Sequence, residues 1–362
     1  DLHGQQSRLE INGVQIYPGS YVPDADLSDL DLKGIDFSMV NFPNANFAGS
    51  NLEGANFDRA ILREANFAGA NLKDANLYWV NFSKANLSDA NFSEANLNRA
   101  TLMGSNIQNA QLAGANLDNV SGFDVKGVPL NLPIEYKLIK GFLLGPKVRI
   151  FNYSIVDLTG ADLTGINLSG AYLSVVNLRG ADLKKVNLTG AKLYEVDFSE
   201  ADLSNTIFTD CYLEDSIFKN NSFIGAIFDN TTFDPHSHQH STAYGNGVNF
   251  SGSDLSGLNF SGASLWGANL SEVDLSGVDF SGANLKEANL SGAEIHDIDL
   301  SSTDLSGVNF ANVKGVPAAL PDGFRLINGY ILGPKVRISS SADLSGGNLA
   351  GLNLEYISMP DV

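Results

Sequence analysis

The stretch that decides the fold begins Ala25-Asp26-Leu27-Ser28-Asp29 and keeps its five-residue pattern without a gap up to Leu117. Each unit has a small residue, then Asp or Asn, then Leu or Phe, then two variable polar residues, as in Ala90-Asn91-Phe92-Ser93-Glu94. A period of five fits neither an α-helix, with about 3.6 residues per turn, nor a single strand, whose side chains alternate. The chain must turn a corner at each unit. Because one unit cannot bury its apolar face alone, the units must stack as a solenoid.

These units resemble the pentapeptide-repeat family, whose motif is A-(D/N)-L-x-x, and the resemblance covers most of the chain. It implies an all-β fold, a right-handed quadrilateral β-helix with four pentapeptides in each coil. It also implies no general enzymatic chemistry. The Asn- and Ser-rich units are most similar to those of long cyanobacterial members. The Asp and Asn side chains of the motif are expected to bond to the nearby turn backbone.

The repeat is interrupted and resumes out of phase, because the distances from Leu117 to Leu158, Phe233 to Phe250 and Phe310 to Leu344 are not multiples of five. These interruptions indicate insertions between arrays. The expected organisation in chain order is an N-terminal hairpin or cap (1–23), a first array (24–120), a hairpin insertion (121–155), a second array (156–233), a His-containing loop (234–248), a third array (249–312), a second hairpin insertion (313–340) and a short terminal array (341–362).

The two longer insertions are similar to each other, since the run from Tyr136 to Ile150 matches the run from Phe324 to Ile338. In the second copy, Asn328-Gly329 predicts a two-residue hairpin turn, in which both central residues need a positive φ. A fainter copy, Ile11 to Pro18, precedes the first array. We expect each hairpin to pack on an open coil end and shield its unpaired backbone edge. The alternative is that the hairpins present a binding surface.

The chain has 362 residues and a formal net charge of −19. An acidic balance disfavours direct binding to nucleic-acid phosphates, which requires Lys and Arg. It leaves open imitation of nucleic acid, or attraction to a cationic partner. Apolar runs are far shorter than the 18 or so residues of a membrane helix, so no membrane partner is expected. The compartment stays open: cytoplasmic, or exported to a periplasm, thylakoid lumen or extracellular space if a leader was removed before Asp1.

Catalytic chemistry is not indicated. The sequence has no nucleophile motif, phosphate-binding Gly-rich loop or cysteine pair, so neither an enzyme, a cofactor nor a small-molecule substrate is expected. The single cysteine, Cys211, stands in the small inward slot, where an inert buried thiol is expected. His236, His238 and His240 alternate along one segment, and their imidazoles would share a face if it is extended. They are a candidate site for Zn²⁺, Ni²⁺ or Cu²⁺. The alternative is a surface loop that tolerates His.

Four pentapeptides per coil would stack residues twenty apart. Trp79 then lies between Arg59 and Arg99 in a column that continues to Met39 and Asn119, with Tyr78 beside it. Such a group is either a self-satisfied cation–π stack or a protein-binding hot spot. A similar column in the second array consists of Tyr172, Lys192 and Tyr212.

A rigid rod with regular faces favours a non-catalytic scaffold that binds another protein through those faces. Arg59, Tyr78, Trp79 and Arg99 are the candidate contact residues. The first alternative is an acidic DNA mimic that binds a type II topoisomerase such as gyrase, as some members of the family do. Those members usually end in a dimer-forming helix, and the sequence shows none. The second alternative is a structural piece of a longer fibre.

Overall fold

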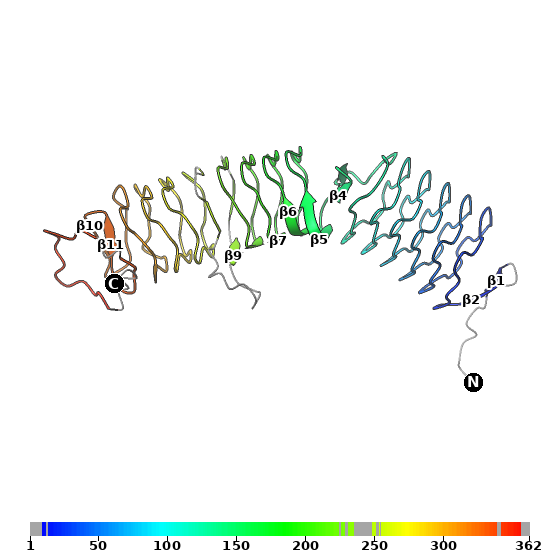
Figure 1. Ribbon diagram of the computed structural model, residues 1–362, viewed down its shortest axis with the longest axis horizontal. Coiled ribbons are helices and arrows are strands. Elements are labelled where there is room, and N and C mark those ends of the chain that lie inside the picture. Colours follow the sequence, from blue (N-terminus) through cyan, green and yellow to red (C-terminus); the bar gives the residue numbers. More distant parts are fainter. Residues whose placement is uncertain are drawn as a thin grey trace, which may run out of the picture. The chain divides into compact units, whose positions relative to one another are not determined.

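The computed structural model describes residues 9–11, 14–223, 226–228, 231–234, 248–250, 253, 255–338 and 342–355. The chain divides into two units. Unit 1 consists of Asp1–Ile150 and Ile166–Ala171, and unit 2 of Phe151–Gly165 and Tyr172–Val362. Figure 1 shows each unit as a succession of similar coils. The described residues contain no helix, and therefore none that could cross a membrane.

Residues twenty apart pair in parallel from Tyr21 to Asn131 in unit 1. Asn46 pairs with Asn66, Asn66 with Asn86, and Asn86 with Asn106. The backbone hydrogen bonds follow the same spacing, since Phe47 N–H donates to Asn66 O at 2.6 Å and Asn66 N–H to Ala45 O at 2.8 Å. Four pentapeptides therefore make one coil, which confirms the four-sided β-helix expected from the sequence.

Each side of a coil ends in a tight turn. In the unit around Phe67, Ala70 N–H donates to Phe67 O at 3.0 Å, and Gly69 between them has a φ of 66°. The second variable position of the motif therefore takes the left-handed region. L-residues other than Gly, Asn and Asp adopt that region at a cost of about 1–2 kcal/mol.

The interior is a column of large and small apolar residues. Phe47 and Phe67 are fully buried, and their rings stack with centroids 4.6 Å apart. Phe37 and Phe57 stack in the same way at 4.9 Å. Alanine fills the small inward slot of most pentapeptides in the first array, and Ala65 has no exposed surface. The Leu or Phe and the small residue of each pentapeptide thus point inward together, as the sequence predicts.

Outside the core, Asn side chains form ladders along the stack. Asn66 Nδ2 donates to Asn46 Oδ1 at 3.0 Å, and Asn86 Nδ2 donates to Asn66 Oδ1 at 3.0 Å. Asn66 Oδ1 also accepts the backbone N–H of Ala68 at 3.2 Å, which confirms the expected bond to the turn backbone. Asp26, at the first step of this ladder, only accepts, from Asn46 Nδ2 at 3.0 Å. A carboxylate fits there because no earlier ladder residue needs a donor.

Three hairpins accompany the coils in the described part of the chain. They are β1 (Leu9–Ile11) with β2 (Val14–Ile16), β3 (Lys137–Ile139) with β4 (Phe142–Leu144), and β10 (Arg325–Ile327) with β11 (Tyr330–Leu332), all antiparallel. The turn of the second hairpin lies on a coil, because Val125 N–H donates to Gly141 O at 2.9 Å. The third repeats this contact, from Val313 N–H to Gly329 O at 2.8 Å. This supports the packing role for both hairpins.

The first array continues further than the sequence pattern does. Ser121, Lys126 and Asn131 pair with residues twenty before them, in parallel. They belong to the segment assigned from the sequence to a hairpin insertion, yet they still form coil backbone. The hairpin itself occupies only β3 and β4, and the coil resumes where Asn119 N–H donates to Lys147 O at 3.1 Å.

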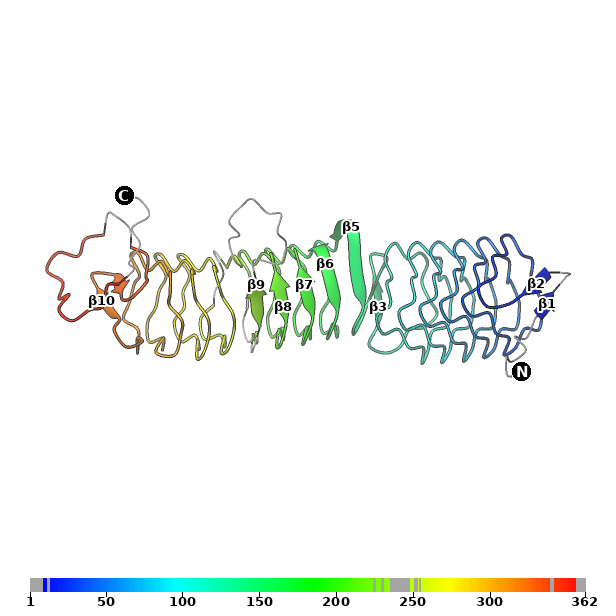
Figure 2. The ribbon, with the colours of Figure 1, turned by 90° about the horizontal axis from the view of Figure 1, so that it is seen from below.

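Unit 2 contains the longest strands. One sheet has five strands in chain order. They are β5 (Arg149–Asp157), which begins at the end of unit 1, β6 (Tyr172–Asn177), β7 (Lys192–Tyr194), β8 (Tyr212–Glu214) and β9 (Thr232–Asp234). The pairs from β6 to β9 are parallel. Figure 2 shows these strands on successive coils.

The second and third arrays are consecutive coils of one stack. Ile217 pairs with Asn249 and Ile227 with Asn259, thirty-two residues apart instead of twenty. Phe218 and Phe250 stack across this step with ring centroids 5.4 Å apart. The segment between the arrays therefore lengthens one coil by twelve residues without breaking the core.

Acid is expected to weaken the stack. Hydrogen bonds from the Ser28, Ser276 and Ser301 hydroxyls, and then from their backbone N–H groups, hold the pKa values of Asp26, Asp274 and Asp299 below the ordinary value. Groups whose pKa falls on folding stabilise the fold above their unfolded pKa, which is about 3.9 for Asp. Their contribution is lost as the pH falls below that value and through the lowered ones.

The measurement is the urea midpoint from pH 7 to pH 2.5 in about 0.5 M NaCl, where salt screens the general repulsion of a chain with net charge −19. We expect a level midpoint down to about pH 4 and a fall below it. A midpoint that stays level throughout the acid range would show that these hydrogen bonds do not stabilise the fold.

Candidate functional site

The column predicted from the sequence lies along one corner of unit 1. Met39, Arg59, Trp79, Arg99 and Asn119 all have φ values between 55° and 62°, so each occupies the turn position of its own coil. The backbone joins them in order, since Arg59 N–H donates to Tyr78 O at 2.8 Å and Trp79 N–H to Asn98 O at 2.9 Å. The structure therefore brings the predicted residues together on one edge.

Trp79 lies between the two guanidinium groups. Arg59 Cζ is 5.9 Å and Arg99 Cζ is 5.6 Å from the centroid of the Trp79 ring. Tyr78 contacts the same ring edge to face, with centroids 6.4 Å apart. Trp79 and Met39 are each 52% exposed. We call Met39, Arg59, Tyr78, Trp79 and Arg99 the Trp79 patch.

Stability alone does not account for a tryptophan at this corner. An exposed cation–π contact contributes about 0.5–1 kcal/mol, so two give about 1–2 kcal/mol. A left-handed backbone costs a residue like Trp about the same amount. Other corners of the unit have Gly, for example Gly54 and Gly69, Asn, for example Asn109, or charged residues, for example Lys84. The favourable cation–π energy and the cost of the left-handed backbone nearly cancel. The large exposed indole therefore has little net effect on the free energy of folding.

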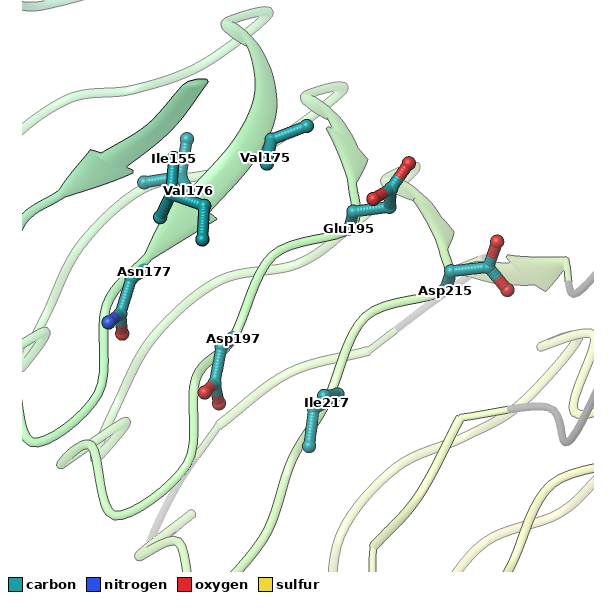
Figure 3. Close-up of a pocket in the computed structure, with 8 residues that line it drawn as sticks. All are labelled: Ile155, Val175, Val176, Asn177, Glu195, Asp197, Asp215 and Ile217. Atoms are coloured by element: carbon teal, nitrogen blue, oxygen red, sulfur yellow. The ribbon is translucent and has the colours of Figure 1, made fainter. Parts of the chain in front are cut away.

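A second feature, in unit 2, was not found from the sequence. Ile155, Val175, Val176, Asn177, Glu195, Asp197, Asp215 and Ile217 line a hollow of about 420 Å³. Figure 3 shows the carboxylates of Glu195, Asp197 and Asp215 and the aliphatic side chains of Ile155, Val175, Val176 and Ile217 along successive coils there. In the sequence Val175, Glu195 and Asp215 stand at the corner position of their pentapeptides, and Asn177, Asp197 and Ile217 stand at the Asp/Asn position. Only their place in the stack brings them together around the hollow.

Two family models match the chain. The model of the pentapeptide repeat region matches residues 35–112, and the model of pentapeptide repeats in eight copies matches residues 156–194, 197–234, 246–282, 268–307 and 283–314. The chain belongs to the pentapeptide-repeat family. Its fold is accordingly the right-handed quadrilateral β-helix. The family is generally non-catalytic.

Solved structures of other pentapeptide-repeat proteins are similar to the chain. HetL, a protein involved in heterocyst differentiation regulation from the cyanobacterium Nostoc sp. strain PCC 7120, is 24% identical over 76% of this chain and 89% of its own, with a TM-score of 0.26. A protein from the Arabidopsis thaliana thylakoid lumen is 35% identical over 27% of this chain and 69% of its own, with a TM-score of 0.20. QnrB1, a plasmid-mediated fluoroquinolone resistance protein, is 20% identical over 57% of this chain and 91% of its own, with a TM-score of 0.23. No curated protein matches the chain.

Two further features predicted from the sequence of this pentapeptide-repeat protein are the histidine metal site and the buried cysteine. His236, His238 and His240 lie outside the described residues, so their metal site stays a prediction. Within the described part of the chain, no group of three or more His, Cys, Asp or Glu side chains could hold a metal ion. Cys211 is 1% exposed, and its Sγ lies 2.8 Å from Leu188 O. The expected burial of this cysteine is confirmed, and burial raises the pKa of its thiol to about 12.

Proposed function

We propose that this pentapeptide-repeat protein is a non-catalytic scaffold that binds a partner protein through the Trp79 patch. The observation that carries the proposal is the half-exposed indole of Trp79 at a left-handed corner, where it contributes little net stability. Trp, Tyr and Arg are the residue types that most often dominate binding energy in protein interfaces. Here all three types adjoin, and the cation–π contacts hold the indole in place before a partner arrives.

The surroundings of the Trp79 patch are suited to a partner with a broad, flat surface. Successive coils repeat their backbone positions, so the neighbouring Asn ladders present regular polar rows beside the patch. Solenoids commonly bind partners over such extended faces. A central apolar anchor within a polar surround is also the usual anatomy of a protein interface.

A Trp79→Asn variant separates binding from folding. Asn already occupies the same corner two coils further along the chain, at Asn119, where its φ is 58°. We therefore expect the urea midpoint to stay close to that of the parent. Loss of an anchoring Trp costs about 2 kcal/mol or more in binding, so the partner's Kd should rise at least about thirtyfold. The partner is first isolated by affinity capture from a lysate of the source organism.

Lys84→Asn is the matched control, because Lys84 is an exposed corner residue of the same unit with a φ of 60° and lies outside the Trp79 patch. It should capture the same protein as the parent. Equal capture by the parent and by Trp79→Asn would refute the proposal. Capture of gyrase subunits would favour the DNA mimic, and capture of further copies of this chain alone would favour the fibre.

A further inference from the structure

Four aromatic side chains form a row on the outer face of the sheet β5–β9 in unit 2. The ring centroids of Phe151 and Tyr172 are 6.4 Å apart, those of Tyr172 and Tyr194 5.1 Å, and those of Tyr194 and Tyr212 5.6 Å. Phe151 is 49% exposed, and the three tyrosines are half-buried. We call Phe151, Tyr172, Tyr194 and Tyr212 the aromatic row.

The repeat does not require aromatic residues at these places. Tyr172, Lys192, Tyr212 and Thr232 pair in register and occupy the Asp/Asn position of the motif. At that position Asn187 Oδ1, for example, accepts the backbone N–H of Thr189 at 2.9 Å and so holds its turn. A tyrosine hydroxyl is too far from its own backbone to make that bond. At Tyr172 and Tyr212, the side chain that would make this local hydrogen bond is replaced by a partly exposed aromatic ring.

The hollow lies at the next corner of the coils, where Glu195 on its wall directly follows Tyr194 of the aromatic row. Two of its aliphatic side chains are accessible, since Ile155 is 69% and Ile217 43% exposed. Val175, on the wall of the hollow, has a φ of 57° and is the one β-branched residue with a positive φ among the described residues. Such strain in a β-branched residue is uncommon and is found most often at functional sites.

Charge decides which partner fits this surface. The hollow has the carboxylates of Glu195, Asp197 and Asp215, and Glu214 accepts the Tyr212 hydroxyl at 3.2 Å. Lys192 is the cation within the register of the row. Carboxylates and aromatic faces attract the same ligand, a cation, and guanidinium stacks on aromatic rings better than ammonium does. The same carboxylates oppose phosphate groups, whether of nucleic acid or of lipid.

We propose that the aromatic row and the hollow together bind an extended, arginine-containing segment of a partner protein. A guanidinium stacks on Tyr172, Tyr194 or Tyr212, and a second pairs with Glu195 and Asp215. The methylene stem of the second arginine packs on Ile155 and Ile217. Lys192 interrupts the row, which favours arginines separated by neutral residues over an unbroken basic run. This surface belongs to unit 2 and is independent of the Trp79 patch.

The test is fluorescence anisotropy with the full chain and a labelled peptide of alternating Arg and Gly, in about 50 mM NaCl to limit screening. The double variant Tyr172→Thr, Tyr212→Thr removes the rings and installs the residue found in register at Thr232. The double variant Glu195→Gln, Asp215→Asn removes two charges and keeps the shapes. We expect each variant to raise the Kd at least about tenfold. Citrulline in place of arginine should abolish binding.

Asp279→Asn with Asp299→Asn is the matched control. It removes the same charge from the third array and retains the Oδ1 atoms that accept the Ser281 and Ser301 N–H groups. Its Kd should stay within about twofold of the parent's. The Trp79→Asn variant should bind the peptide unchanged, so this result is independent of the scaffold experiment. The proposal is overturned if the parent does not bind the peptide, if the control loses as much affinity as the charge variant, or if the citrulline peptide binds equally well.

Discussion

Phe218→Ala is expected to lower the free energy of unfolding of unit 2 by about 3–5 kcal/mol, the usual cost of emptying a fully buried phenylalanine site. Phe218 has no exposed surface. Its ring stacks on Phe198, with centroids 4.7 Å apart, and on Phe250, at 5.4 Å. It therefore joins the last regular coil of the second array to the first coil of the third. Urea unfolding followed by far-UV circular dichroism measures the loss.

Phe218→Leu is the control, because leucine is the other residue that the motif places at this inward position. It should cost less than about 1.5 kcal/mol. If the two arrays form one stack, Phe218→Ala should also accelerate amide exchange at Phe250, whose N–H donates to Asn269 O at 3.0 Å. Unchanged exchange there would mean that the arrays unfold independently, contrary to the continuous core.

The sequence predicts the coil and its core because each pentapeptide carries the same burial pattern. The large residue of every unit, such as Phe47 or Phe67, must face inward wherever the period holds. The column at Trp79 was predictable because the family resemblance implies four pentapeptides in each coil, so that twenty residues return the chain to the same corner. The local pattern determines which residues face inward, and no distant contact is needed to specify them.

The continuity of the coil stack across the interruptions of the repeat was not predictable from the local pattern. The period is lost between Phe233 and Phe250, yet Ile217 and Asn249 pair as any two neighbouring coils do. Twelve extra residues in one coil are compatible with the hydrogen bonds between the described residues on either side, since Phe218 N–H donates to Asn249 O at 3.0 Å. The five-residue period is interrupted by such an insertion. The pairing of neighbouring coils nevertheless continues on both sides of it.

The hollow beside the aromatic row was missed for a different reason. Val175, Glu195 and Asp215 occupy corner positions, where the motif tolerates almost any polar residue. Nothing in a single pentapeptide distinguishes them. Their combination depends on which coils are adjacent and on the exposed Ile155 of β5, which lies where the chain resumes after a hairpin. The sequence signal that was available is the replacement of Asp or Asn by Tyr172 and Tyr212.

Gly145→Ala should destabilise the hairpin β3–β4 by about 1–3 kcal/mol, the usual cost of overpacking. A Cβ atom at Gly145 would lie 2.3 Å from Cδ1 of Tyr136. That ring cannot move aside easily, because it is 8% exposed and its hydroxyl donates to Pro146 O at 3.0 Å. Amide exchange at Val125, whose N–H donates to Gly141 O, reports on the hairpin and should become faster. Unchanged protection at Val125 would contradict the prediction.

A double-mutant cycle shows whether the ring is the cause. Tyr136→Ala alone should weaken the hairpin, but adding Gly145→Ala to it should cost little more, because the clash has gone. Gly54→Ala is the contrasting control. The φ of Gly54 is 66°, and nothing lies within 4 Å of the position that an added Cβ would occupy. The cost of this substitution therefore comes from the backbone alone, and deletion of a ring does not relieve it. The third hairpin has the same arrangement, since a Cβ at Gly333 would lie 2.3 Å from Cδ1 of Phe324. A glycine against an aromatic ring is thus the contact that both copies of the insertion share, and Gly333→Ala should disturb β10–β11 in the same way.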